Sequence, residues 1–155
     1  MLIPDGVAGT RATLRKMSHI VREYRSNYPV IELSRYLVAN LQQKDFFGEA
    51  ALIQQFVRDQ IRYVKDPRGV ETIQTPVKTL EIGQGDCDDK SILVATMLET
   101  LGHRCLFVAV GFDKNFCHVL VKCFLNNEWV AVETTEPVEI GWYPKNVTNE
   151  MIEYI

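Results

Sequence analysis

The segment from Asp88 to Leu101 most constrains the fold, because apolar residues cover nearly the whole circumference of the helix that it predicts. These residues are Ile92, Leu93, Val94, Ala95, Met97, Leu98 and Leu101. Gly102 follows at the position where helices commonly end. A helix that is apolar on every side has to be covered by other elements. We therefore expect it at the centre of one domain, which is what 155 residues usually build.

The segments before this helix predict a helical half. Apolar residues at helical spacing indicate helices over 10–27, from Pro29 to about residue 41, and over 46–63. Residues 65–83 hold prolines and glycines and predict a loop.

The segments after Gly102 change to the alternating pattern of strands. Three strands are expected over 105–112, 116–125 and 128–135, the last two joined at Asn126-Asn127. The tail, 136–155, predicts a short terminal helix. Helices followed by antiparallel strands predict an α+β domain.

Charge and composition exclude several classes of protein. The chain has 17 Lys plus Arg and 20 Asp plus Glu, a net charge of -3, which argues against nucleic-acid binding. No apolar run approaches the roughly 20 residues of a membrane span. The segment Met1–Gly9 lacks the pattern of a signal peptide, so we expect a cytoplasmic protein with reduced thiols. The four cysteines form no C-x-x-C pair, which argues against zinc, and we expect no cofactor.

The segment Gly83–Asp89 predicts how the buried helix begins and places a cysteine there. Asp86 is a good N-cap, and Asp89 suits the acidic position of a capping box. Cys87 then lies in the first turn, where free backbone N–H groups stabilise a thiolate and could hold an oxyanion. This pattern predicts that Cys87 is a nucleophile.

Two other interpretations of this segment stay open. The carboxylates of Asp86, Asp88 and Asp89 raise the pKa of a nearby thiol, so a protonated histidine has to outweigh them, and Cys87 could be incidental to a helix start. The three aspartates could also form a carboxylate metal site. That site lacks histidine ligands at helical spacing, and we expect no bound metal.

We interpret the remaining cysteines and two of the histidines as ordinary structural residues without a catalytic role. Cys105, Cys117 and Cys123 lie in strand patterns rich in Val, Leu and Phe, so we expect them to be buried, reduced and unbonded. We expect His19 and His103 to be exposed.

The predicted hairpin brings His118 and Glu133 together. With the turn at Asn126-Asn127, Leu120 faces Glu133, which leaves His118 as its diagonal neighbour on the same face. A carboxylate there can fix the imidazole tautomer and stabilise its charged form. A slip of one residue in register would destroy the arrangement.

These pieces resemble the transglutaminase-like superfamily. The resemblance covers roughly residues 50–137 and is carried by the segments Ile61–Val64, Gly85–Asp89, Leu98–Gly102, Cys117–Val121 and Trp129–Thr135. The form Gly-Asp-Cys-Asp-Asp, in a short chain with a helical extension, is most similar to the versions found in tailed phages and prophages.

The resemblance implies a papain-like fold and a triad of Cys87, His118 and Glu133, with Glu where the family usually has Asp. It implies a helical part over 1–45 and a catalytic core over about 46–140 within one domain. The family's side-chain oxyanion donor is often an upstream Trp or Gln, and Gln84 and Tyr63 are the candidates here.

The activity expected is that of a cysteine peptidase or amidase, with a protein or peptide substrate and a thioester intermediate. The alternatives are cross-linking by acyl transfer to an amine, and a non-catalytic phage assembly module that binds phage structural proteins.

Overall fold

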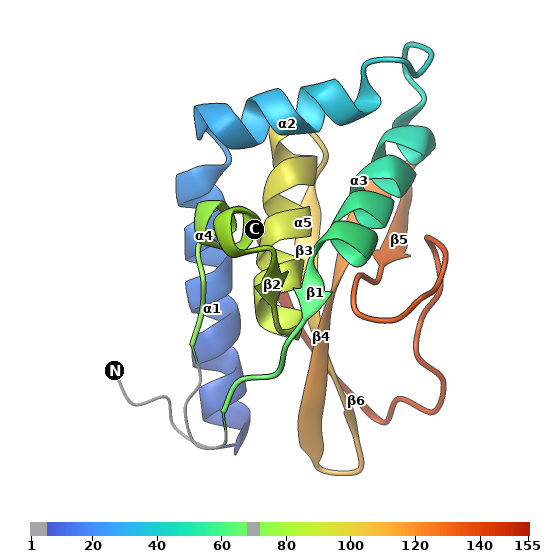
Figure 1. The fold of residues 1–155 in the computed structure, drawn as a ribbon. Helices are drawn as coiled ribbons and strands as arrows, with labels where there is room; N and C mark the ends of the chain where they lie inside the picture. Colours follow the sequence, from blue (N-terminus) through green and yellow to red (C-terminus); the bar gives the residue numbers. More distant parts are fainter. Residues whose placement is uncertain (1–5, 68–71) are drawn as a thin grey trace.

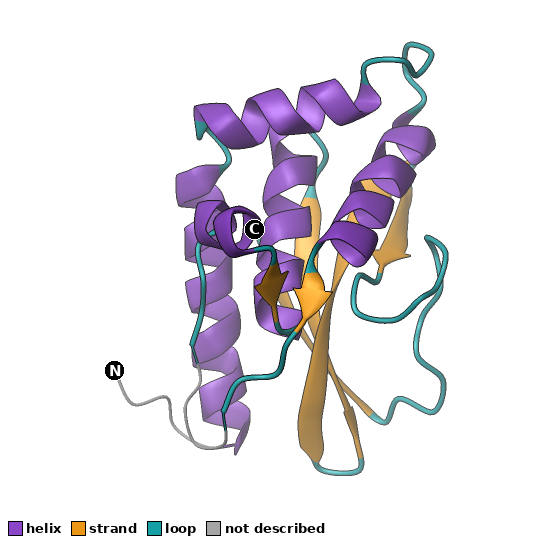
Figure 2. Ribbon diagram, viewed as in Figure 1, coloured by secondary structure: helices purple, strands orange, loops and turns teal. Residues whose placement is uncertain are grey.

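A layer of helices packs against one face of a four-stranded antiparallel sheet in this computed structural model, which describes residues 6–67 and 72–155 (Figures 1 and 2). The sheet order is β5-β4-β3-β6. The strands are β3 (Cys105–Phe112), β4 (Asn115–Leu125), β5 (Glu128–Val132) and β6 (Asn149–Tyr154). The helices are α1 (Gly6–Tyr24), α2 (Tyr28–Val38), α3 (Phe46–Gln60), α4 (Pro76–Ile82) and α5 (Cys87–Thr100). The α+β architecture is therefore the one that the sequence predicts.

Helix α5 lies at the centre of the molecule, as its apolar circumference predicts. Ile92, Leu93, Val94 and Met97 are all fully buried. Helices α1, α2, α3 and α4 pack around α5, and its remaining side faces strands β3 and β4. This packing fixes the N-terminal turn of α5, which carries Cys87, against the sheet.

The helices that precede α5 begin where their capping residues predict. The side chain of Asn27 accepts a hydrogen bond from the Val30 N–H at the start of α2, and Asp45 accepts one from the Gly48 N–H at the start of α3. Such caps satisfy backbone donors that a helix start otherwise leaves free. Helix α3 ends at Gln60 with Ile61 as its C-cap, and the chain then continues directly into the short strand β1 (Arg62–Tyr63).

The hairpin of β4 and β5 has the predicted register. Leu125 pairs with Glu128, Phe124 with Trp129 and Val121 with Val132. Asn126 and Asn127 both adopt positive φ, as a two-residue hairpin turn requires. Strand β5 stops pairing at Val132, so Glu133 lies just beyond the last paired residue.

Two segments differ from the sequence-based expectation. Residues 76–82 form helix α4 inside the expected loop, because Thr75 caps the start, Pro76 occupies the first turn and Gly83 ends it in the left-handed region. The tail ends in strand β6 instead of a short helix. Its residues pair with β3 residues that lie 38 to 48 positions upstream, so the local sequence pattern gives little indication of this strand.

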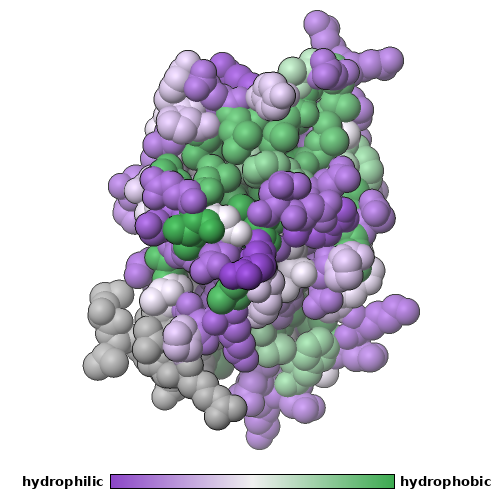
Figure 3. Space-filling model, in the orientation of Figure 1, coloured by the Kyte–Doolittle hydropathy of each residue, from purple (hydrophilic) through white to green (hydrophobic). Residues whose placement is uncertain are grey.

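The surface has a hollow between α2 and α3. Its volume is about 280 Å³, and its apolar lining comes from Leu37, Leu52 and Phe56. Hydrophobic side chains gather over these two helices in the space-filling view (Figure 3). No helix among residues 6–67 and 72–155 has the length and apolar character of a membrane span.

Candidate active site

Cys87 is the first residue of α5, and the predicted capping box fixes its position. Asp86 accepts hydrogen bonds from the N–H groups of Asp88 (2.9 Å) and Asp89 (3.1 Å), while the Asp89 carboxylate accepts one from the Asp86 N–H (3.3 Å). A Cβ on Gly85 would lie 2.6 Å from the Asp89 Cβ, so glycine is required for this close approach. The sequence thus places a thiol at the positive end of the central helix.

The loop before α4 donates hydrogen bonds to the capping box of α5. Gln74 donates to the Asp89 carboxylate through its backbone N–H (2.8 Å) and its side-chain Nε2 (2.6 Å). Asp89 is buried, so these bonds satisfy a carboxylate that would otherwise be costly there. Asp89 therefore supports the helix start and lies turned toward Gln74.

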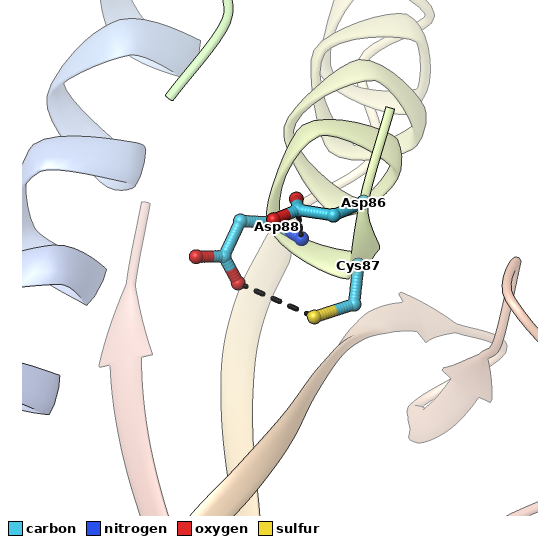
Figure 4. A group of neighbouring side chains, drawn as sticks. All are labelled: Asp86, Cys87 and Asp88. Atoms are coloured by element: carbon cyan, nitrogen blue, oxygen red, sulfur yellow. Dashed lines mark hydrogen bonds between the residues drawn. The ribbon is translucent and has the colours of Figure 1, made fainter. Parts of the chain in front are cut away.

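The thiol of Cys87 donates a hydrogen bond to Asp88 Oδ1 across 3.6 Å, as Figure 4 shows. Burial raises the pKa of this thiol most, and the carboxylates of Asp88 and Asp86 raise it further. A hydrogen bond with the Val119 backbone opposes them, but the pKa stays well above its usual value. Burial also raises the pKa of Asp86, to about 6. The resting thiol is therefore protonated.

His118 and Glu133 form the diagonal contact that strand parity predicts. His118 Nε2 lies 2.6 Å from a Glu133 carboxylate oxygen. The Glu133 side chain is 1% exposed and that of His118 is 20% exposed. The hydrogen bond occupies Nε2 and leaves Nδ1 as the ring nitrogen for other chemistry.

Glu133 is held by backbone and side-chain donors beyond the end of β5. Its other carboxylate oxygen accepts from the Thr135 N–H (2.6 Å), and its backbone carbonyl accepts from Gln54 Nε2 on α3 (2.8 Å). Burial alone would raise the pKa of Glu133, but the hydrogen bond and charge of His118, with the N–H groups of Thr135 and Glu136, outweigh burial and lower the pKa. Glu133 is thus a buried, ionised carboxylate.

Cys87 and His118 belong to elements that touch each other. The sulfur interacts with the backbone of Val119, the residue after His118, and Ser91 Oγ donates to the Val119 carbonyl (3.3 Å). In the described part of the chain, the sulfur donates to Asp88 and makes no hydrogen bond to His118. A separation of about 4 Å or less between the Cys87 sulfur and a ring nitrogen of His118 stays a prediction.

The two candidate oxyanion donors lie on a short parallel pair of strands beside the thiol. Strand β1 pairs with β2 (Gln84–Gly85), and Tyr63 is opposite Gly85. The side chain of Gln84 accepts from Arg62 (2.9 Å). Tyr63 is 45% exposed, and burial raises the pKa of its hydroxyl, as do the nearby carboxylates of Asp86 and Asp88, so the hydroxyl stays protonated.

Comparison with known proteins agrees with this architecture. A model of the transglutaminase-like superfamily matches residues 31–134. The chain belongs to the transglutaminase-like superfamily. The matched region contains the whole segment from α3 to Glu133, including Cys87 and His118. No curated protein matches the chain significantly.

Solved structures share this superfamily fold at low identity. A candidate protease from Parabacteroides distasonis aligns at a TM-score of 0.65 and 15% identity, over 81% of this chain and 26% of its own. A candidate cysteine protease from Cytophaga hutchinsonii aligns at 0.58 and 11%, over 87% and 51%. Calcium-bound LapG from Legionella pneumophila aligns at 0.60 and 17%, over 87% and 80%. The chain therefore spans about a quarter of the length of the first protein and about half of the length of the second.

Three residues around the start of α5 offer possible metal-ligand atoms that lie close together. Single atoms of Asp86, Cys87 and Asp88 lie within 4.8 Å of one another. Asp86 is already the N-cap and Asp88 accepts from the thiol, so the structure gives both carboxylates a role in the helix start. Asp89, the third residue of the expected carboxylate set, binds Gln74.

Two expectations about nearby residues were wrong. Cys117 is exposed, because it is the extra residue of a bulge between the pairs Val110–His118 and Gly111–Phe116. His103 is buried, since its Nε2 lies 2.6 Å from a Glu49 carboxylate oxygen on α3. Cys105 and Cys123 are buried and free, as expected.

Sequence reasoning missed two polar residues of the core, Gln54 and Lys90. Gln54 is 1% exposed and binds the carbonyls of Glu133 and Val138. Lys90 is 2% exposed and lies one turn after Cys87. The sequence contains an indication that each residue is buried. Gln54 shares the apolar face of α3 with Ala50, Ile53 and Val57. Lys90 lies in a helix that is apolar on every side.

Proposed function

We propose that this chain is a cysteine hydrolase, a peptidase or amidase, in which Cys87 is the nucleophile, His118 the base and Glu133 the residue that orients the base. The contact between His118 and Glu133 is the observation that carries the proposal. A buried carboxylate on Nε2 fixes the tautomer that leaves Nδ1 able to accept a proton. Membership of the superfamily and the likeness to candidate proteases support the same chemistry.

The first half-reaction forms a thioester. His118 Nδ1 takes the proton from the Cys87 thiol, and the sulfur attacks the carbonyl carbon of the substrate amide. The Cys87 N–H and the Tyr63 hydroxyl stabilise the oxyanion, because the N–H groups of Asp88 and Asp89 already donate to the Asp86 cap. Gln84 is the second side-chain candidate, since Arg62 binds its Oε1 and leaves its Nε2 able to donate. The C–N bond then breaks, and the leaving amine takes the proton from the His118 imidazolium.

The second half-reaction releases the acid. A water molecule attacks the thioester carbonyl while His118 removes a proton from that water, and the C–S bond breaks to restore the thiol with the proton returned from His118. Because the thiol is protonated at rest, His118 acts as a general base during the attack. The charge of Glu133 stabilises the imidazolium at both stages.

Hydrolysis is favoured over transfer to an amine because the site is open to water. His118 is 20% exposed and Tyr63 is 45% exposed. Acyl transfer needs water to be kept away from the thioester. The substrate is a protein or peptide, and the Gly-Asp-Cys-Asp-Asp form suggests a phage or prophage setting with phage structural proteins among its partners.

The experiment that tests this proposal uses p-nitrophenyl acetate. The protein should release p-nitrophenolate with turnover, and peptide mass spectrometry should find the acetyl group on Cys87 and not on the exposed Cys117. His118→Ala should abolish acetylation of Cys87. An added amine should capture little of the acetyl group. Acetylation of Cys87 no faster than of Cys117 would instead favour the non-catalytic assembly module.

A further inference from the structure

Cys105 and Cys123 are two buried thiols that the proposed mechanism does not use. They are direct partners in the register of β3 and β4, and both are free. Both side chains are almost completely enclosed, in the core between the sheet and the helices. Two thiols at opposed positions of neighbouring strands can become a disulfide where the backbone geometry allows it.

The backbone hydrogen bonds show which kind of pair these two residues form. The Phe124 N–H donates to the Arg104 carbonyl (2.9 Å), so the hydrogen-bonded pair of the ladder is the neighbouring one. The Cys105 N–H donates to Glu99 Oε1 (2.9 Å), and its carbonyl accepts from the Ile155 N–H (3.4 Å). Neither group bonds to β4, so the two cysteines form a non-hydrogen-bonded pair, where opposed side chains lie closest.

This position suits a disulfide between the two strands. The Cα atoms of a non-hydrogen-bonded pair lie about 4.5 Å apart, and a disulfide joins Cα atoms about 4.4–6.8 Å apart. The Cβ atoms of opposed residues lie roughly 4.5 Å apart or slightly farther, near the upper end of the disulfide range. A small approach of the two side chains is therefore enough for the bond to form.

The other two cysteines have no such partner. Cys117 is the extra residue of the bulge and has no opposed residue in β3. Cys87 lies at the start of α5, where its thiol donates to Asp88. Among the residues that the structure describes, Cys105 and Cys123 are therefore the one pair of cysteines opposed across a ladder.

We propose that Cys105 and Cys123 form an intrachain disulfide by exchange with a small disulfide such as glutathione disulfide. One cysteine loses its proton, its sulfur attacks the small disulfide, and the S–S bond of the reagent breaks to release one small thiolate that takes the proton. The second cysteine, deprotonated in turn, attacks the mixed disulfide. The protein S–S bond forms and a second small thiol leaves, so two cysteines are oxidised and one small disulfide is reduced.

The burial of the pair controls how fast the bond forms and breaks. Burial raises the pKa of Cys105 well above its usual value, and few thiolates are present to attack. A reagent reaches the sulfurs when β3 and β4 separate, so we expect slow exchange in the folded protein and faster exchange in mild urea. The finished disulfide is equally enclosed and should resist reduction.

The test incubates the wild-type protein with glutathione disulfide and an excess of glutathione, at about pH 8 in mild urea, and then removes the urea. The excess of the small thiol keeps isolated cysteines reduced. Thiol titration in denaturant should fall from the four free thiols to two. Peptide mapping without reductant should join the peptides of Cys105 and Cys123. The same reaction without urea should be about tenfold slower or more.

Thermal unfolding shows whether the folded register accommodates the bond. The oxidised protein should unfold roughly 5–10 °C above the reduced protein, because the bond closes a loop in the unfolded chain. Cys123→Ala is the matched control and should show neither the link nor the change in Tm. Cys117→Ala should still form the link between β3 and β4.

Three results would overturn the proposal. The first is a protein that keeps four free thiols at equilibrium, and the second is a link that joins other cysteines, such as Cys87 and Cys117. The third is an oxidised protein that unfolds at a lower temperature than the reduced one. None of these measurements uses acetylation of Cys87, so failure here leaves the proposed function unaffected.

Discussion

His118 Nε2 lies 2.6 Å from the Glu133 carboxylate, one residue beyond the point where β5 stops pairing with β4. The ladder fixes His118, but Glu133 depends on Gln54, Thr135 and His118 itself for its place. The proposed base and its partner are therefore held by different kinds of contact. Substitutions of Glu133 can therefore test the effect of its charge separately from the effect of its position.

Glu133→Gln should reduce the rate of Cys87 acetylation by roughly 10³- to 10⁴-fold, by analogy with the loss when a triad carboxylate becomes an amide. The amide keeps the shape but removes the charge that stabilises the imidazolium. Glu139→Gln, at a side chain that is 94% exposed, is the matched control and should retain full activity. Equal rates in the two variants would remove Glu133 from the mechanism. Glu133→Asp should retain activity, since it keeps the charge that stabilises the imidazolium.

Asp88→Asn should make Cys87 more reactive toward iodoacetamide near neutral pH. The carboxylate of Asp88 accepts from the thiol and raises its pKa, and an amide removes that negative charge. A several-fold increase is expected, measured for each cysteine by peptide mass spectrometry because Cys117 is also exposed. Asp113→Asn, in the turn between β3 and β4, should leave the rate unchanged. A slower reaction in Asp88→Asn would contradict the electrostatic account.

Tyr63→Phe should lower kcat for p-nitrophenyl acetate by roughly 10²- to 10³-fold, the usual cost of losing one oxyanion donor. Gln84→Leu should have a much smaller effect if Tyr63 is the donor; it is the necessary comparison, because Arg62 binds Gln84 Oε1 and leaves Nε2 able to donate. The comparison tests which residue of the parallel pair β1–β2 supplies the donor. The reverse order of effects would assign that role to Gln84.

Asp86→Asn should increase the free energy of unfolding at pH 7 by about 1–2 kcal/mol, measured by urea denaturation. Burial raises the pKa of Asp86 from 3.8 to about 6 in the folded protein. The folded state therefore binds the proton more tightly, and stability falls as pH rises from about 4 to 6. Asn keeps the capping oxygen without this penalty. The difference should vanish at pH 4, and a difference that is constant with pH would contradict the linkage.

The sequence predicts the parts of the site that depend on local rules. The capping box of Asp86 and Asp89 follows from residue spacing, and the Asn126-Asn127 turn sets the register that joins His118 to Glu133. The surroundings of these residues depend on contacts between distant segments. Glu49 meets His103 across 54 positions and Gln54 meets Glu133 across 79, and nothing within either segment indicates its partner. The bulge that exposes Cys117 likewise depends on how β3 meets β4.

Helix α1 and strand β6 lie at opposite ends of the described chain yet bind each other. Ser18 Oγ donates to the Tyr154 carbonyl (2.9 Å), and Arg11 donates to the Ile152 carbonyl (3.1 Å). A ribosome adds about 5–20 residues per second, so β6 emerges on the order of ten seconds after α1. During synthesis, α1 therefore keeps part of its contact surface uncovered until Asn149–Tyr154 has been made.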